Sequence, residues 1–473
     1  MTENMTGVDN SCSGAAAPLS VPLPDGTVYS RTKGVQPTEA PFSLSPLSAY
    51  EPIIGEQKTE RLLAAIEKVK GLKILELNST AVGGGVAEML HSSVPFLNEL
   101  GIDNEWQVIR GSKPFYETTK AIHNLLQGRG GYFTTDMEKI YFRTLKENGS
   151  CDTRARDADI VIIHDPQPLG IVPRCYENEQ KKGKWIWRCH IDMDEETLQA
   201  NPTLEFFINY WVEPMDAAIF SAAQYIICRW PFPKFIIPPF IDPLSPKNRD
   251  LTRKEIDEVM ERYGIDPSLP IICQIGRFDP WKGLDTVVEV YKKVKERTRC
   301  QLVIAGGTAT DDPEGDTILS MVRKQVGKDP DAHILCLPPT SDIEINALQR
   351  ASRVLLQLST KEGFGLTVTE ALWKSRPVIA SPVGGITQQI RDGEYGFFHH
   401  NFKDTVDNIL YILENPPAAE LLGRRGHLYV KDHFLMPDRL ADHLKAMDMV
   451  RHSTLDPDSI ISFHSWHKLD KRK

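Results

Sequence analysis

Two glutamates stand eight residues apart in the segment STKEGFGLTVTEAL, on either side of a glycine–phenylalanine–glycine turn. The turn follows an apolar run and leads into a helical pattern. Free N–H groups at the start of a helix attract anions, so this turn could hold a phosphate group. Glu362 precedes the turn and Glu370 lies about one turn into the helix. They would then accept hydrogen bonds from hydroxyls at the two ends of one phosphate-containing ligand.

Two basic residues, Arg277 and Lys282, lie five residues apart directly after the apolar run PIICQIG. Two cations at the end of a strand suit a diphosphate. A surface salt bridge would explain either residue alone, but the position after a buried strand favours a binding role.

Three consecutive glycines, Gly83, Gly84 and Gly85, join the apolar run LKILELN to another helical pattern. Glycines let backbone N–H groups come close to a ligand, although a flexible turn is an equal alternative. The spacing matches neither the dinucleotide-binding fingerprint nor the P-loop, so neither a nicotinamide cofactor nor ATP hydrolysis is indicated.

The elements that must position these residues form two sets of apolar runs alternating with helical patterns. The first set is 72–78, 106–110, 158–164, 184–191 and 217–222, and the second is 270–276, 300–306, 333–338, 353–359 and 377–381. Continuous Val, Ile and Leu runs indicate strands buried on both faces. Alternation with helices predicts two doubly wound α/β domains. Ligands bind beyond the carboxyl ends of such strands, so we expect a site in the cleft between the domains.

The chain of 473 residues is long enough for two domains. We expect an irregular arm at 1–45, a first α/β domain at 46–240, a second α/β domain at 241–435, and a final segment, 436–473, whose helix packs back on the first domain. The proline-rich stretch 233–248 is interpreted as the linker between the domains.

Charge and composition exclude several partners. The net charge is −9, with a pI near 5.9, which argues against nucleic-acid binding and against attraction to an anionic membrane. No apolar run reaches the length of a membrane span. The eight cysteines form no CxxC pair, and several lie in apolar runs, so we expect buried reduced thiols. With no signal-peptide pattern at the N-terminus, a cytoplasmic location is expected.

Together these motifs resemble those of the GT-B retaining glycosyltransferases of family 4, over residues 70 to about 395. More narrowly, NSTAVGGGVAEML, WRCHIDMD, QIGRFDPWKG and STKEGFGLTVTEALWK look like the trehalose glycosyltransferring synthases. The resemblance implies a GT-B fold of two Rossmann-like domains and a retaining hexosyltransferase that joins glucose from an NDP-glucose to free glucose. Trehalose phosphorylases share many of these strings.

The resemblance also implies residue roles. Arg277 and Lys282 would neutralise the leaving diphosphate, and Glu362 would face the donor sugar. His190 would lie under the reacting sugar, and Glu370 would hold the ribose. The other donor contacts would come from Gly84, Gly85, Gly363, Phe364, Gly365 and Leu366. The acceptor pocket would involve His164, Asp165, Gln167 and Asp192.

No metal and no cofactor is expected. Asp192 and Asp194 spell DxD, which holds a metal in other glycosyltransferases, but two cations already stand where that metal would act. A helix N-cap or an acceptor contact is therefore favoured. The adjacent pair His399 and His400 lacks further ligands at suitable spacing, so a loop pair is favoured over a zinc site.

Three alternatives remain beside the synthase. The chain could be a trehalose phosphorylase that uses inorganic phosphate, a related transferase with another sugar acceptor, or an inactive sugar-binding protein on the same fold. The expected partners are a nucleotide-sugar and a small sugar acceptor, with a homodimer left open.

Overall fold

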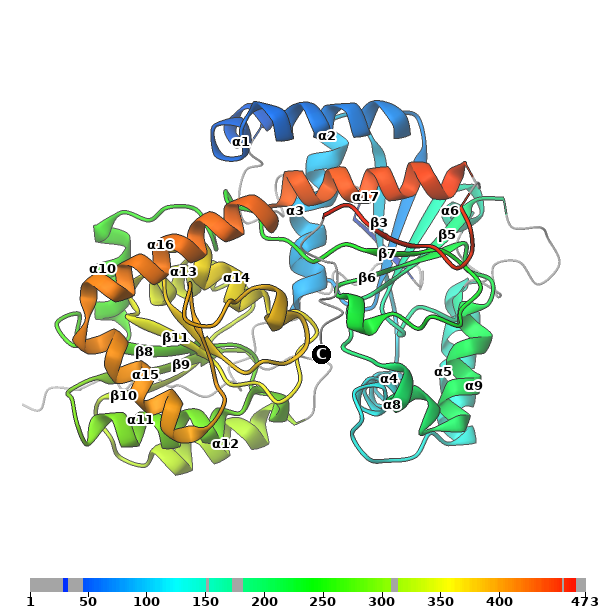
Figure 1. The fold of residues 1–473 in the computed structure, drawn as a ribbon. Helices are drawn as coiled ribbons and strands as arrows, with labels where there is room; N and C mark the ends of the chain where they lie inside the picture. The colour runs from blue at the N-terminus through cyan, green and yellow to red at the C-terminus, as the bar shows by residue number, and fades with distance from the viewer. Residues whose placement is uncertain are drawn as a thin grey trace, which may run out of the picture.

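The computed structural model describes residues 29–32, 46–149, 153–171, 182–307, 314–452 and 455–464. Figure 1 shows two lobes, each built on a mainly parallel sheet that is flanked by helices. The predicted α/β class with two Rossmann-like sheets is therefore confirmed.

The first sheet has the order β1-β3-β2-β4-β5-β6-β7-β14 and is parallel apart from the β1–β3 pair. Its central strands are buried along their length, which explains their continuous apolar sequences. The strands are β1 Tyr29–Thr32, β2 Lys73–Asn78, β3 Asp103–Ile109, β4 Ile160–His164, β5 Lys184–Cys189, β6 Ala217–Phe220, β7 Lys234–Ile236 and β14 Ile460–Ser462. The helices before residue 213 are α1 Leu47–Ile54, α2 Glu56–Val69, α3 Gly85–Glu99, α4 Lys113–Leu126, α5 Thr135–Gly149, α6 Thr153–Asp157, α8 Glu195–Gln199 and α9 Pro202–Val212.

The second sheet has the order β10-β9-β8-β11-β12-β13, and every pairing in it is parallel. Its strands are β8 Ile271–Ile275, β9 Gln301–Gly306, β10 Ala332–Cys336, β11 Val354–Gln357, β12 Val378–Ala380 and β13 Phe397–Phe398. Its helices are α10 Arg253–Arg262, α11 Leu284–Lys295, α12 Gly315–Val326, α13 Asp342–Ala351, α14 Leu366–Trp373, α15 Phe402–Glu414 and α16 Pro416–His433. The carboxyl end of β8 leads to Arg277, and that of β11 leads to Glu362.

The proline-rich stretch is not only a linker. Strand β7 lies inside it and pairs with β6 and β14. Pro233 stands before β7 and Pro238 follows soon after it, so the prolines bound a short strand where their missing N–H groups cost little. The N-terminal arm likewise contributes β1, which pairs with β3, while residues 1–28 and 33–45 lie outside the described residues.

The last helix, α17 Met436–Arg451, continues from α16 of the second lobe and lies alongside α2 of the first (Figure 1). Its buried residues Met436, Leu440 and Leu444 belong to the same hydrophobic cluster as Ile160 of β4. Strand β14 then joins the edge of the first sheet. The first and the last of the described strands, β1 and β14, therefore belong to the same sheet.

The cysteines differ partly from the expectation. Cys189, Cys273 and Cys300 are buried free thiols, whereas Cys228 is free but exposed. Cys336 is disulfide-bonded, contrary to the prediction. It ends the edge strand β10 and is only half-buried, so an apolar flanking sequence did not imply an inaccessible thiol. Among the described residues, no helix is both long and apolar enough to cross a membrane.

Candidate active site

The GFG turn of the second domain rests against the carboxyl end of β5 in the first. A Cβ atom at Gly363 would lie 2.2 Å from the carbonyl oxygen of His190, so only glycine allows this approach. The hydroxyl of Tyr225 donates to the carbonyl oxygens of Glu362 and Gly363, at 3.1 and 2.8 Å. The Glu362 N–H donates to Asp192 Oδ2 at 3.2 Å. These contacts hold the two strand-end loops together.

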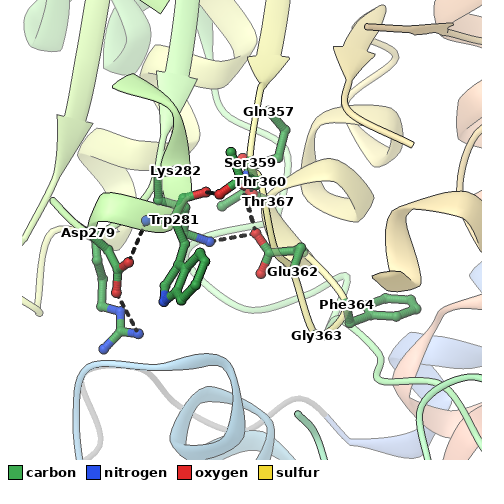
Figure 2. Close-up of polar contacts among 12 residues, drawn as sticks. Asp279, Trp281, Lys282, Gln357, Ser359, Thr360, Glu362, Gly363, Phe364 and Thr367 are labelled. Carbon is green, nitrogen blue, oxygen red and sulfur yellow. Dashed lines mark hydrogen bonds and ion pairs between the residues drawn. The ribbon is translucent and has the colours of Figure 1, made fainter. Parts of the chain in front are cut away.

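Glu362 is held by three donors from its own domain (Figure 2). Lys282 Nζ lies 2.6 Å from Glu362 Oε2, and the same oxygen accepts from Gln357 Nε2 at 3.0 Å and from Ser359 Oγ at 3.2 Å. The side chains of Lys282 and Glu362 are 17% and 13% exposed. The motif that contains Lys282 and the motif that contains Glu362 are thus brought together. One carboxylate oxygen of Glu362 is already engaged by these three donors.

Arg277 lies in the same loop as Lys282 but has a different partner. Its Nη2 is 3.8 Å from Asp279 Oδ2, and its side chain is 41% exposed. Lys120, from α4 of the first domain, approaches the same Asp279 oxygen at 3.3 Å. Burial alone would raise the pKa of Asp279, but the charge of Lys120, the hydrogen bond from the Trp281 N–H and the charges of Arg277 and Lys282 together outweigh it and lower that pKa. Three cations therefore surround one carboxylate beside the end of β8.

Two helix N-termini face each other near this positive charge. Helix α3 begins at Gly85, and a Cβ atom there would lie 2.9 Å from Cδ1 of Leu366, the first residue of α14. Gly84 precedes α3 as an exposed residue, and Gly365 precedes α14 at a φ of 83°. The N-terminus of a helix favours an anion. Phe364 points away from Glu362 (Figure 2), and its buried ring packs against Phe434, so only its backbone is available to a ligand.

Glu370 is fully buried and lies apart from Glu362. Its Oε1 is 3.1 Å from Lys247 Nζ, and its Oε2 accepts from Gln349 Nε2 at 2.9 Å. Lys247 also pairs with Glu88 of α3, at 2.8 Å. Burial alone would raise the pKa of Glu370, but the charges of Lys247 and Lys374 and the hydrogen bonds from Gln349 and Lys247 together outweigh it and lower that pKa. Ligand hydroxyls that reach Glu370 must therefore share it with Lys247 or displace Lys247.

On the first domain, two of the predicted acceptor residues, His164 and Asp165, form a hydrogen-bonded group with His190 and Glu76. His164 Nδ1 lies 3.0 Å from His190 Nε2, and His164 Nε2 lies 2.7 Å from Glu76 Oε2. Asp165 has a φ of 64°, and its Oδ1 accepts from the His190 N–H at 2.7 Å. Burial raises the pKa of Asp165 to about 6. Both ring nitrogens of His164 are engaged within the protein, and Gln167 lies half-buried beyond this group.

The DxD motif and the adjacent pair of histidines, which were both weighed as metal sites, contact protein groups in the structure. Asp194 caps α8, since its Oδ1 accepts from the Thr197 N–H at 2.7 Å, as the N-cap interpretation predicted. Asp192 accepts from Gln127 and from the Glu362 N–H. His399 contacts Thr405 and His400 contacts Asp392, so the loop histidines point to separate groups.

Four polar residues of this region were not singled out from the sequence: Glu76, Lys120, Tyr225 and Lys247. Glu76 alone had a readable signal, because it is a carboxylate in the middle of the apolar run LKILELN. Lys120, Tyr225 and Lys247 reach the site from a helix, a 3₁₀ turn and the interdomain segment. Their places follow from the packing of the domains and not from local spacing.

Comparison with known proteins gives two matching family models, "Trehalose synthase, N-terminal domain" over residues 76–227 and "Glycosyl transferases group 1" over residues 255–428. A trehalose synthase of Thermococcus litoralis is 41% identical, covering 85% of this chain and 96% of its own. A trehalose phosphorylase of Pleurotus pulmonarius is 30% identical, covering 74% of this chain and 53% of its own. A solved UDP-forming α,α-trehalose-phosphate synthase from Burkholderia xenovorans has a TM-score of 0.66 at 13% identity, covering 79% of this chain and 99% of its own, which shows the shared GT-B fold.

Proposed function

The chain belongs to the trehalose synthase family and is a hexosyltransferase acting in trehalose-related glycosyl transfer, and we propose that it moves glucose from an NDP-glucose to free glucose with retention of configuration. The positive charge at the end of β8 is the observation that supports a nucleotide-sugar as the donor. Lys120, Arg277 and Lys282 gather there, near the N-termini of α3 and α14. This arrangement suits a doubly charged leaving group.

The surroundings of Glu362 favour attack on the same face of the sugar that the diphosphate leaves. A double inversion would need a free carboxylate at the anomeric carbon. Glu362 has one oxygen held by Lys282, Gln357 and Ser359, which suits a hydrogen-bond acceptor for sugar hydroxyls more than a nucleophile. The cations would stabilise the departing diphosphate, whose oxygen would take the proton of the acceptor hydroxyl.

In this proposal Glu370 accepts hydrogen bonds from the ribose hydroxyls. Its lowered pKa keeps it ionised, so it acts as an acceptor only. Lys247 would remain nearby and link the ribose site to Glu88 of α3. Bound donor would thereby be linked through Lys247 to a helix of the first domain.

The test is a matrix of NDP-glucoses against sugar acceptors, with NMR of the product. We expect trehalose and free NDP with glucose as acceptor, at equal rates with and without EDTA because protein cations take the role of a metal. If the product is a different disaccharide, the acceptor is another sugar and not glucose. Nucleotide-independent phosphorolysis of trehalose would replace the synthase with a phosphorylase, and activity that returns only with Mg²⁺ or Mn²⁺ would refute the metal-free site.

A further inference from the structure

A chain of three polar side chains runs across three neighbouring strands of the first sheet. Glu76, His164 and His190 lie on or directly after the neighbouring strands β2, β4 and β5. Side chains alternate between the two faces of a sheet, so residues an even number of positions apart on one strand share a face. Glu76, His164 and His190 lie an even number of residues beyond Ile74, Ile160 and Ile186, respectively, and the register of the strands puts these isoleucines on the same face. Glu76 and His164 are 7% and 6% exposed, whereas His190 is half-buried. Of the three, His190 is the most exposed, and it lies against the GFG turn of the second domain.

The two imidazole rings meet end to end. His164 Nδ1 is 3.0 Å from His190 Nε2, the ring centroids are 5.3 Å apart, and the planes differ by 13°. Rings stacked face to face would approach to about 3.5–4.0 Å. The longer centroid distance, the near-parallel planes and the short N···N distance together describe two nearly coplanar rings joined by a hydrogen bond.

The hydrogen bonds determine which nitrogens carry protons. An ionised carboxylate accepts only, so Glu76 requires a proton on His164 Nε2. In a neutral His164, Nδ1 is then an acceptor, and His190 Nε2 must donate to it. His190 Nδ1 is left with a lone pair and has no hydrogen-bond partner among the residues that the structure describes.

We propose that Glu76 and His164 are positioning residues for hexosyl transfer, which fix His190 as the Nε2–H tautomer and leave its Nδ1 lone pair to accept a hydrogen bond from a sugar hydroxyl. The proposal rests on the proposed function, because the hydroxyl belongs to a sugar bound in the cleft. Its direct test, the tautomer of His190, needs no substrate.

A buried cation supports the neutral state of this chain. Arg188 is 1% exposed, lies next to His164 in the register of β4 and β5, and leaves both Nη atoms without a partner among the described residues. Burial and the charge of Arg188 lower the pKa of His190 well below its usual range. A second cation beside Arg188 is therefore disfavoured, and the imidazole of His190 stays neutral.

The tautomer can be read by long-range ¹H–¹⁵N NMR on protein labelled only at histidine, with the His190 signals assigned from a His190→Asn sample. We expect the Nε2–H pattern for His190 at pH 7.5 in the wild type without substrate. An Nδ1–H pattern or a doubly protonated ring would overturn the proposal whatever reaction the enzyme performs. A failed trehalose assay would count against the proposed function alone.

Two variants of His164 test the consequence for turnover. In His164→Asn, the side-chain oxygen can replace Nδ1 as acceptor for His190, so we expect kcat within about threefold of the wild type. In His164→Leu, His190 loses its partner, and kcat should fall about 10- to 100-fold while KM for the donor stays nearly constant. His333→Asn on β10 is the matched control and should not change kcat. Equal losses in the Asn and Leu variants, with unchanged melting temperatures, would contradict the positioning role.

Discussion

At the scale of single residues, the contact between Lys282 and Glu362 would define the donor side of the proposed site. Lys282 lies between the carboxylate that would face the sugar and the charge cluster that would face the diphosphate. This position explains why the two motifs must occur together, although they are 80 residues apart in the chain.

Replacing Lys282 with alanine should reduce kcat/KM strongly while the fold survives. Loss of one charged group at a leaving phosphate corresponds to about 2–4 kcal/mol of transition-state stabilisation. Arg277→Ala should behave in the same way. Lys293→Ala on α11, whose side chain is 53% exposed, is the control. Wild-type kinetics in both site variants, with unchanged melting temperature, would remove the phosphate role.

Glu370→Gln should weaken the binding of free NDP, measured by titration calorimetry. The amide keeps the shape of the side chain but loses the charge, and each charged hydrogen bond to a hydroxyl is worth about 1.5–3 kcal/mol. Glu362→Gln should leave NDP affinity nearly unchanged, because free NDP carries no sugar. If Glu370→Gln binds NDP as tightly as the wild type, the ribose role of Glu370 is wrong.

At the scale of elements, the GFG turn is the point where the second domain touches the first. The close approach of Gly363 to His190 fixes how far the loop before α14 can enter the cleft. The same approach brings Glu362 within reach of Asp192 and Tyr225. An element of the second domain thus also positions residues of the first domain.

Gly363→Ala should lower turnover, since its Cβ would overlap a backbone oxygen that cannot turn aside. Forced displacements of this kind cost about 1–3 kcal/mol. We expect the loss in kcat/KM together with nearly unchanged NDP affinity. Gly130→Ala, where a Cβ would meet nothing within 4 Å, is the control. Full activity in Gly363→Ala would show that the closed contact between the domains is not needed for turnover.

The long strands and helices could be predicted from the sequence because runs such as ADIVIIH carry a buried-strand pattern and sit between clear helical periods. The short strands β1, β7 and β14 could not, since each has only three or four residues and lies in a proline-rich or polar segment. For the site, the motifs predicted the closeness of Lys282 and Glu362. The motifs could not show that Lys247 forms an ion pair with Glu370, because that contact depends on how the segments pack.

At the scale of the whole molecule, the C-terminal segment ties the second domain to the first. Arg439 of α17 is fully buried and pairs with Asp438 and Asp442, each at 2.7 Å. The same two carboxylates pair with Arg61 of α2, and His464 reaches Asp442 at 3.0 Å. A buried charge cluster therefore fixes α17 on the first domain.

Arg439→Met should destabilise the protein by about 3–5 kcal/mol, because it leaves buried carboxylates short of a partner. Arg424→Met removes an exposed ion pair with Glu420 and should cost less than about 1 kcal/mol. Urea unfolding of both variants measures the difference. Equal stability would mean that the Arg439 cluster contributes little to holding α17 in place.

The central claim is that the leaving group is a nucleoside diphosphate, and the reverse reaction tests it most directly. The wild-type protein is incubated with trehalose and either an NDP or inorganic phosphate, over a panel of nucleobases, and the products are followed by ³¹P NMR. The account predicts that NDP-glucose forms in at least one NDP sample and that the phosphate sample stays unchanged. Formation of glucose 1-phosphate from phosphate, with no NDP-glucose from any NDP, would contradict it.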